Sequence, residues 1–225
     1  MNQKTAILIF ANSAEKEVER KSFLSTEVFA ALNSHTLKTV EKSGIDYFHI
    51  SEKQQIGTSF GERFSNAINA IFNKGFNNVI TIGNDTPHLK THHLVDTLHQ
   101  LETKDVVLGP SKDGGFYLMG IKKAQFNKET FIELPWQTNR LHKSIATIAA
   151  TKNLEVQFLE LLNDIDSKED IRFILNSFKA IPEFILKLLQ KLFFTFKSTF
   201  FLENFSTLKT SFSKNYNKGS PLIFA

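Results

Sequence analysis

Two stretches of the sequence place an acidic side chain a few residues after an apolar, β-branched run. Asp85 ends the run that begins at Val79, and Asp113 follows the run that begins at Asp105 and precedes the pair Gly114 and Gly115. Such runs predict buried strands, and ligands of open α/β folds bind at the carboxyl ends of those strands. A carboxylate there can hold a divalent cation, accept a hydrogen bond from a sugar hydroxyl or act as a base. Both aspartates are therefore candidate site residues, although each position also suits an aspartate that only forms a turn.

A second acidic cluster lies near residue 165. Asp164 and Asp166 follow the segment Glu155–Leu159, which we expect to be extended. In an extended chain residues i and i+2 face the same way, so the two carboxylates could serve one ion. Asp166 also precedes Ser167, a predicted helix N-cap, and its charge would be favourable there without any ligand.

Apolar periods of two and 3.6 residues alternate along the chain, which predicts an α/β domain of sheet and helices. The Ser59-Phe-Gly-Glu62 and Ser167-Lys-Glu-Asp170 segments are capping boxes, and each predicts a helix start. The expected strands are Thr5–Phe10, Tyr47–Ile50, Asn78–Ile82, Asp105–Leu108, Phe116–Ile121 and the extended Glu155–Leu159. The expected helices are Lys21–Glu41, one from Ser59 to a stop at Gly75, Thr91–Leu101, Asn139–Thr151 and one from Ser167 through Phe178.

Composition narrows the class of protein. The chain has 225 residues and no cysteine, which excludes disulfides and thiolate metal sites. The apolar stretch Ala6–Ala11 is too short for a signal peptide, so a cytoplasmic protein is expected. The formal net charge of +4 belongs to residues 180–225, which contain six lysines and two glutamates, and the preceding residues are formally neutral. This distribution gives no support for nucleic-acid binding by the main body.

These motifs together resemble the bacterial glycosyltransferase-like family of GT-A type, which is related to the molybdenum-cofactor and deazaflavin-precursor guanylyltransferases. Order and spacing agree over about residues 5–178. The matching motifs are Gln55-x-Gly57-x-x-x-Gly61-Glu62-Arg63, Gly83-Asn-Asp85-Thr-Pro87-His-Leu89, Asp105–Gly120, Trp136-Gln-Thr138 and Asp164-Ile-Asp166-Ser-Lys-Glu169-Asp170-Ile171.

The resemblance implies a three-layer α/β/α nucleotide-diphosphosugar-transferase fold with a mostly parallel central sheet and the nucleotide at its amino-terminal half. It implies Mg²⁺ or Mn²⁺ as the cofactor, held by Asp85 and Asp166, with Asp164 as a further candidate ligand. The other carried-over residues are Asp113 as the catalytic base, with Gly114, Gly115, Arg63 and Trp136 as substrate-binding residues. A guanidinium such as that of Arg63 can bind two phosphate oxygens at once.

The loop after the first strand departs from the family pattern, which has a glycine, a proline and basic residues there. This chain has Ala11–Lys21 instead, and its Glu15, Glu17 and Glu19 would repel a diphosphate at close range. Arg20 and Lys21 are the candidate replacements for the missing basic residues. Three functions follow: transfer of a glycosyl group from a nucleotide-sugar, nucleotidyl transfer from a nucleoside triphosphate to a phosphorylated small molecule, or nucleotide binding by a weakened enzyme or scaffold.

Four histidines lie close together in the sequence and suggest a zinc site: His88, His92, His93 and His99. Their placement does not favour this interpretation. His88 and His92 have i, i+4 spacing, yet Pro87 and a helix start near Thr91 leave His88 off the helix face.

The sequence supports a separate prediction for its last segment, residues 180–225. We divide the chain into a transferase domain, residues 1–179, and a helical extension with a loosely ordered tail, residues 180–225. The helix expected from about Pro182 to Leu202 is apolar on most of its circumference and carries lysines such as Lys187 and Lys191. It could pack on the body, form a homodimer or lie at a membrane interface, which would make the protein membrane-associated.

Overall fold

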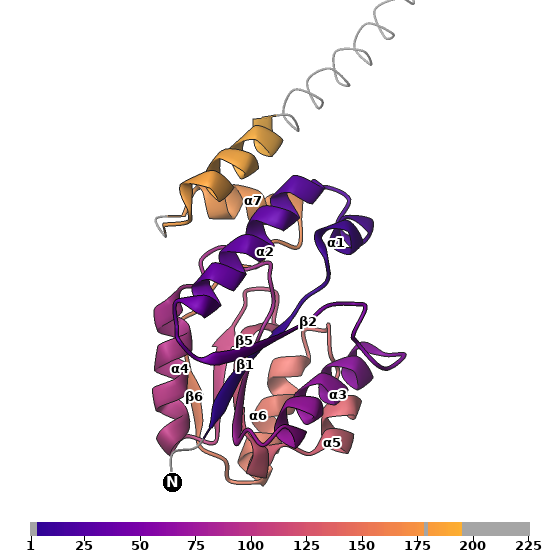
Figure 1. Ribbon diagram of the computed structural model, residues 1–225, viewed down its shortest axis with the longest axis vertical. Coiled ribbons are helices and arrows are strands. Elements are labelled where there is room, and N and C mark those ends of the chain that lie inside the picture. Colours follow the sequence, from indigo (N-terminus) through magenta and orange to yellow (C-terminus); the bar gives the residue numbers. More distant parts are fainter. Residues whose placement is uncertain (1–3, 178–179, 195–225) are drawn as a thin grey trace, which may run out of the picture.

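The computed structural model describes residues 4–177 and 180–194, and within them six strands form one sheet in the order β2-β1-β3-β5-β4-β6. The strands are β1 (Thr5–Phe10), β2 (Asp46–Ile50), β3 (Asn78–Ile82), β4 (Val106–Pro110), β5 (Phe116–Lys122) and β6 (Val156–Phe158). Only β5 runs antiparallel to its neighbours, β3 and β4. The expected mostly parallel sheet is therefore confirmed, with one reversed strand inserted near its centre (Figure 1).

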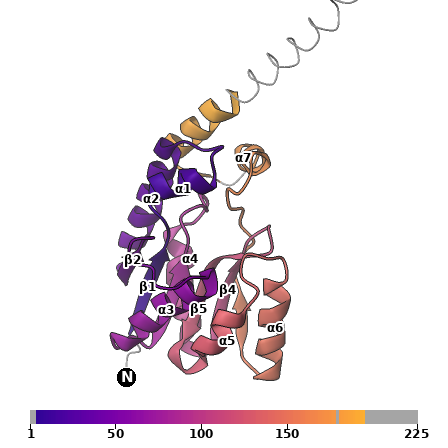
Figure 2. The same cartoon turned by 90° about the vertical axis from the view of Figure 1, so that its right-hand side faces the viewer.

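Helices cover both faces of the sheet, which confirms the three-layer arrangement. One face packs against α2 (Thr26–Glu41) and α4 (Thr91–Thr103) through residues such as Ile7, Ile80 and Leu94. The other face, turned to the viewer in Figure 2, packs against α3 (Phe60–Asn73), α5 (Lys128–Glu133) and α6 (Leu141–Thr151). The alternation of inward residues along β1 decides this division, since Ile7 faces one layer and Leu8 the other.

The predicted helix starts at the two capping boxes are confirmed. Ser59 and Glu62 cap each other at the start of α3, and Ser167 and Asp170 do so at the start of α7 (Lys168–Leu175). Most other boundaries differ from the predicted ones by a few residues. A short helix α5 and a 3₁₀ turn η1 (Lys123–Gln125) were not predicted.

The predicted helix Lys21–Glu41 is wrong at its start. Residues Ala14–Arg20 form a separate helix, α1, and the chain turns before α2 begins at Thr26. Two serines explain the break, because Ser13 caps α1 by accepting from Lys16 N and Ser25 caps α2 by accepting from Val28 N. The loop expected after the first strand is thus largely helical.

A third apolar cluster lies at the carboxyl end of the parallel strands, where α1, α7 and the helix of residues 183–194 meet α2 (Figure 1). Ile185 and Leu189 are fully buried there against α2 residues such as Phe29 and α7 residues such as Ile174. Residues 195–225 of the expected extension lie outside the described residues. Within 4–177 and 180–194, no helix has both the length and the apolar character needed to cross a membrane.

Candidate active site at the carboxyl edge of the sheet

A cavity of about 490 Å³ opens at the carboxyl ends of β1 and β3 and beside the turn between β4 and β5. It brings together most of the predicted site residues: Arg20, Arg63, Asp85, Asp113, Gly115, Trp136, Asp164 and Asp166. Lys21 and Gly114 do not line it. Segments far apart in the sequence therefore converge on one polar cavity with an aromatic wall.

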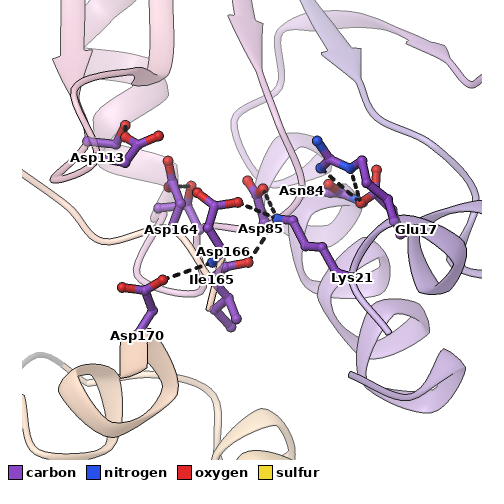
Figure 3. A network of polar contacts seen from close by, with 12 residues as sticks. Glu17, Lys21, Asn84, Asp85, Asp113, Asp164, Ile165, Asp166 and Asp170 are labelled. Carbon is purple, nitrogen blue, oxygen red and sulfur yellow. Dashed lines mark hydrogen bonds and ion pairs between the residues drawn. The ribbon is translucent and has the colours of Figure 1, made fainter. Parts of the chain in front are cut away.

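Lys21 lies beside this cavity, between two of the predicted metal ligands. Its ammonium nitrogen is 2.7 Å from Asp85 Oδ2 and 2.8 Å from Asp166 Oδ1, and it also donates to the carbonyl oxygen of Ile165 at 2.8 Å (Figure 3). The Lys21 side chain is only 6% exposed. The residue predicted to contact phosphate is thus the internal partner of the acidic cluster.

The charged side chains of Lys21, Asp85 and Asp166 shift one another's pKa values. Burial disfavours the ionised form of Lys21, but the Asp85 and Asp166 carboxylates outweigh burial and raise its pKa. Burial likewise opposes ionisation of Asp85, but Lys21 outweighs it and holds the pKa of Asp85 below its usual value. Lys21 and Asp85 therefore form a charged pair, and each stabilises the other's ionised state.

Asp164 has no such cationic partner among its described contacts. Its carboxylate accepts a hydrogen bond from the hydroxyl of Thr86, the residue that follows Asp85. Burial and then the negative charge of Asp85 raise the pKa of Asp164 well above its usual value. For Asp166, burial raises the pKa and outweighs the opposing effect of Lys21. Sequence reasoning missed Thr86, although its place in the Asn-Asp-Thr-Pro turn beside Asp85 was a usable signal.

The loop that carries Asp113 is a tight turn between β4 and β5. Asp113 Oδ1 accepts from the backbone N–H of Gly115 at 2.9 Å and from the hydroxyl of Ser111. Gly114 has a φ of 94°, a conformation that side chains other than glycine's rarely allow, so this glycine is required by the turn itself. The turn presents Asp113 to the cavity on the side of Asp164 (Figure 3).

Helix α1 places its acidic residues differently from the expectation. Glu15 and Glu19 are exposed and only Glu17 is buried and lines the cavity. Glu17 accepts hydrogen bonds from Asn12 at 2.6 Å and from Arg20 at 3.0 Å. The predicted repulsion therefore concerns Glu17, and Arg20 offsets its charge.

Arg63 and Trp136 both line the cavity. Arg63 donates to Gln55 Oε1 at 3.2 Å and to the carbonyl of Thr58 at 2.9 Å, so it also holds the loop before α3. The Trp136 indole donates to the carbonyl of Phe131 at 2.6 Å, and its ring lies 5.0 Å from that of Phe64. Trp136 thus combines a place in the cavity wall with a packing role.

His88, His92, His93 and His99 do not line this cavity. Among the described residues, one set of three histidine or acidic side chains brings its ligand atoms within 4.8 Å of one another, and it consists of His92, His93 and Glu160. His93 Nδ1 accepts from the backbone N–H of Lys90 at 3.0 Å, which assigns the ring proton to Nε2, 2.9 Å from Glu160. A protonated Nε2 has no lone pair for a metal, so the hydrogen bonds of His93 explain this cluster without zinc.

The acidic cluster fits a divalent cation in its chemistry, since carboxylate oxygens are the preferred ligands of Mg²⁺ and Mn²⁺. Asp164 lines the cavity, whereas one oxygen each of Asp85 and Asp166 already binds the Lys21 ammonium. A resident metal would therefore be held by Asp164 together with the other oxygen of Asp166.

Residues 17–138 match the family described as "Uncharacterized protein conserved in bacteria (DUF2064)". The chain belongs to this family. No curated protein matches the sequence. The matched segment begins within α1 and ends at Thr138, and it includes Asp85, Asp113 and Trp136.

Solved structures identify the fold. A protein of Desulfovibrio desulfuricans G20, provisionally assigned as a nucleotide-diphospho-sugar transferase, is similar over 84% of this chain and 95% of its own, with 22% identity and a TM-score of 0.73. The 4-diphosphocytidyl-2C-methyl-D-erythritol synthase of Anaerococcus prevotii DSM 20548 is similar over 76% of this chain and 96% of its own, with 12% identity and a TM-score of 0.52. The chain therefore has the nucleotide-diphospho-sugar transferase fold, as the sequence predicted.

Proposed function

We propose that this protein binds a nucleotide-sugar in the cavity at the carboxyl edge of the sheet and transfers the glycosyl group to an acceptor. One observation supports this most strongly: the same cavity joins two arginines, Arg20 and Arg63, to the carboxylates of Asp113 and Asp164. Guanidinium groups bind diphosphate oxygens, and carboxylates bind sugar hydroxyls or a metal ion.

In this proposal Arg20 and Arg63 bind the nucleotide diphosphate, and Phe60 and Trp136 supply apolar contact for the base or ribose. Asp113 accepts the proton of the acceptor hydroxyl as the new bond to the sugar carbon forms and the bond to the diphosphate oxygen breaks. The hydrogen bonds that Ser111 and Gly115 donate to Asp113 within the turn hold its carboxylate in place for this transfer. Bound Mg²⁺ or Mn²⁺ would neutralise the departing diphosphate.

A binding screen followed by product analysis tests the proposal. Nucleoside diphosphates, triphosphates and nucleotide-sugars are compared by calorimetric titration with and without Mn²⁺, using Arg63→Ala as the site variant. Arg172→Ala is the matched control, because Arg172 is an exposed arginine of α7 that does not line the cavity. We expect a nucleotide-sugar to bind, Arg63→Ala to weaken it and the control to leave it unchanged.

The products separate the remaining alternatives. Release of a nucleoside diphosphate from the bound donor supports glycosyl transfer. Release of pyrophosphate from a triphosphate would instead support nucleotidyl transfer to a phosphorylated small molecule. Tight nucleotide binding without turnover of any donor would support a binding or scaffold role, and no binding of any nucleotide would overturn the assignment of the cavity.

A further inference from the structure

We propose that Lys21 is a built-in cation that takes the place of a metal ion between Asp85 and Asp166, so that Asp85 is a partner of Lys21 and not a metal ligand. This inference concerns the cation alone and stands whether or not the cavity accepts a nucleotide-sugar. It reassigns two residues whose types suggested other roles, a phosphate contact for Lys21 and metal binding for Asp85.

The first argument for this proposal comes from the hydrogen bonds of the Lys21 ammonium. A lysine ammonium has three N–H groups and no acceptor. Lys21 has three partners, which are Asp85 Oδ2 at 2.7 Å, Asp166 Oδ1 at 2.8 Å and the carbonyl oxygen of Ile165 at 2.8 Å. All three hydrogens are therefore used within the protein, and a phosphate could gain one only by displacing a carboxylate or the carbonyl.

The fold holds this ammonium in place. Lys21 is the C-cap residue that follows α1, and its backbone N–H donates to the carbonyl of Glu17 at 2.8 Å. Its side chain is 6% exposed and reaches the end of β3 through Asp85 and the segment before α7 through Ile165 and Asp166. Movement of Lys21 into solvent would leave the Asp85 carboxylate without its counter-charge, which is costly for a largely buried group.

The position of the ammonium matters because a metal shared by Asp85 and Asp166 would need the same oxygens. Lys21 binds one oxygen of each, and a second cation at those atoms would be repelled by the first at close range. In the described residues, no three of Asp85, Asp113, Asp164 and Asp166 bring their ligand oxygens within 4.8 Å of one another, whereas His92, His93 and Glu160 do meet that distance. Lys21 thus divides the acidic cluster, and Asp164 and the second oxygen of Asp166 stay available to a metal.

Removing the ammonium should create the metal site that Lys21 replaces. In Lys21→Met a side chain of similar length loses its charge, and Asp85 and Asp166 regain two carboxylates for one ion. We expect Mn²⁺ alone, titrated by calorimetry, to bind this variant roughly tenfold or more tighter than the wild type, since affinity rises with the number of charged ligands. The gain should disappear in the double variant Lys21→Met, Asp85→Asn. Lys16→Met is the matched control, because Lys16 is an exposed α1 lysine paired with Glu19.

A second comparison does not depend on the folding of a Lys21 variant. Asp85→Asn in the otherwise wild-type chain keeps an oxygen that can accept from Lys21, and we expect its Mn²⁺ affinity to equal that of the wild type. A loss of about tenfold or more in this single variant would show that Asp85 is a metal ligand beside Lys21 and would overturn the proposal. Unchanged Mn²⁺ affinity in a folded Lys21→Met would overturn it equally.

Discussion

Arg20 covers the buried charge of Glu17 one helical turn away, with 3.0 Å between Arg20 Nη2 and Glu17 Oε2. The Glu17 side chain is 4% exposed and that of Arg20 is 50% exposed. The acidic segment after β1 therefore presents a neutralised pair to the cavity, and its other glutamates, Glu15 and Glu19, are exposed. Arg20 therefore lies at this edge of the cavity, but its guanidinium is already paired with Glu17.

Glu17→Gln should strengthen nucleotide binding, because it releases Arg20 for the phosphates. Glutamine still offers an oxygen to Asn12, which now donates to Glu17 at 2.6 Å, so the local fold should survive. We expect a gain of roughly threefold to tenfold in affinity, equivalent to about 1 kcal/mol, in calorimetric titration at low salt. The double variant Glu15→Gln, Glu19→Gln should change affinity little. Equal effects of both substitutions would mean that general charge, and not the Glu17–Arg20 pair, governs binding.

Asp113→Asn should abolish turnover and spare binding. Asparagine keeps one oxygen for the N–H of Gly115 but cannot accept the acceptor's proton. We expect kcat to fall by about 10²–10⁴ with donor affinity unchanged. Ser111→Ala is the control for a purely conformational role, since it removes the other bond that holds the Asp113 carboxylate. A larger loss in Ser111→Ala than in Asp113→Asn would assign Asp113 to the turn alone.

Local signals in the sequence were enough to predict the sheet, the layers and the two capping boxes. The apolar period of Val79–Ile82 identifies β3, and Ser59 with Glu62 marks the start of α3, because each signal lies within a few residues. Most of the site residues that were predicted then line one cavity. These parts of the structure depend on short-range patterns that a single sequence retains.

The partner of Lys21 could not be predicted in this way. Its contacts join residues 64 and 144 positions apart, and nothing in the local sequence marks them. The break between α1 and α2 had a local signal in Ser25, but the family pattern favoured a loop for residues 11–21. Whether a lysine faces a ligand or a carboxylate is decided by tertiary packing.

Asp164 should make the stability of the metal-free protein depend on pH. Burial and the charge of Asp85 raise its pKa above the ordinary 3.8, so the folded chain holds this proton more tightly than the unfolded chain. The tighter proton binding stabilises the folded state fully at pH values below the ordinary pKa of 3.8. This stabilisation is lost as the pH rises through the raised pKa of Asp164 in the folded chain. Asp85, whose pKa is lowered, acts in the opposite direction, and its contribution is lost as pH falls.

We therefore expect Asp164→Asn to be more stable than the wild type at about pH 7, and this advantage to shrink toward about pH 4. Urea unfolding in the presence of EDTA at several pH values measures the difference. An advantage of the same size at every pH would mean that the ionisation of Asp164 is not its cause.

Gly61→Ala should destabilise the wall formed by α3 and α5. A Cβ at Gly61 would lie 2.5 Å from the carbonyl oxygen of Ile132 and 3.0 Å from Trp136 Cδ1. Alanine favours helices over glycine, but the clash with backbone should dominate and lower the free energy of unfolding by about 1–3 kcal/mol. Asn69→Ala, a half-buried position on the same helix, should stay within about 0.5 kcal/mol. Urea unfolding of both variants checks this, and an unchanged Gly61→Ala would show that α5 can move away freely.

The helix of residues 183–194 provides the last prediction, because its burial bears on the proposed boundary at residue 180. Leu189 is fully buried in the cluster that contains Val28 of α2 and Ile171 of α7, whereas Gln190 is exposed. Leu189→Ala should therefore lower the free energy of unfolding by about 2–5 kcal/mol. Gln190→Ala should change it by no more than about 0.5 kcal/mol.

Truncation after Lys179 extends this test to the whole segment. It would uncover the apolar face of α2 around Val28, so we expect a less stable body that aggregates at a lower temperature. Light scattering during thermal unfolding, compared with the full chain, measures this. If the truncated chain keeps the full stability and loses only dimerisation or binding to anionic vesicles, residues 180–225 form a separable association module, and the buried contacts of Leu189 contribute little to the body.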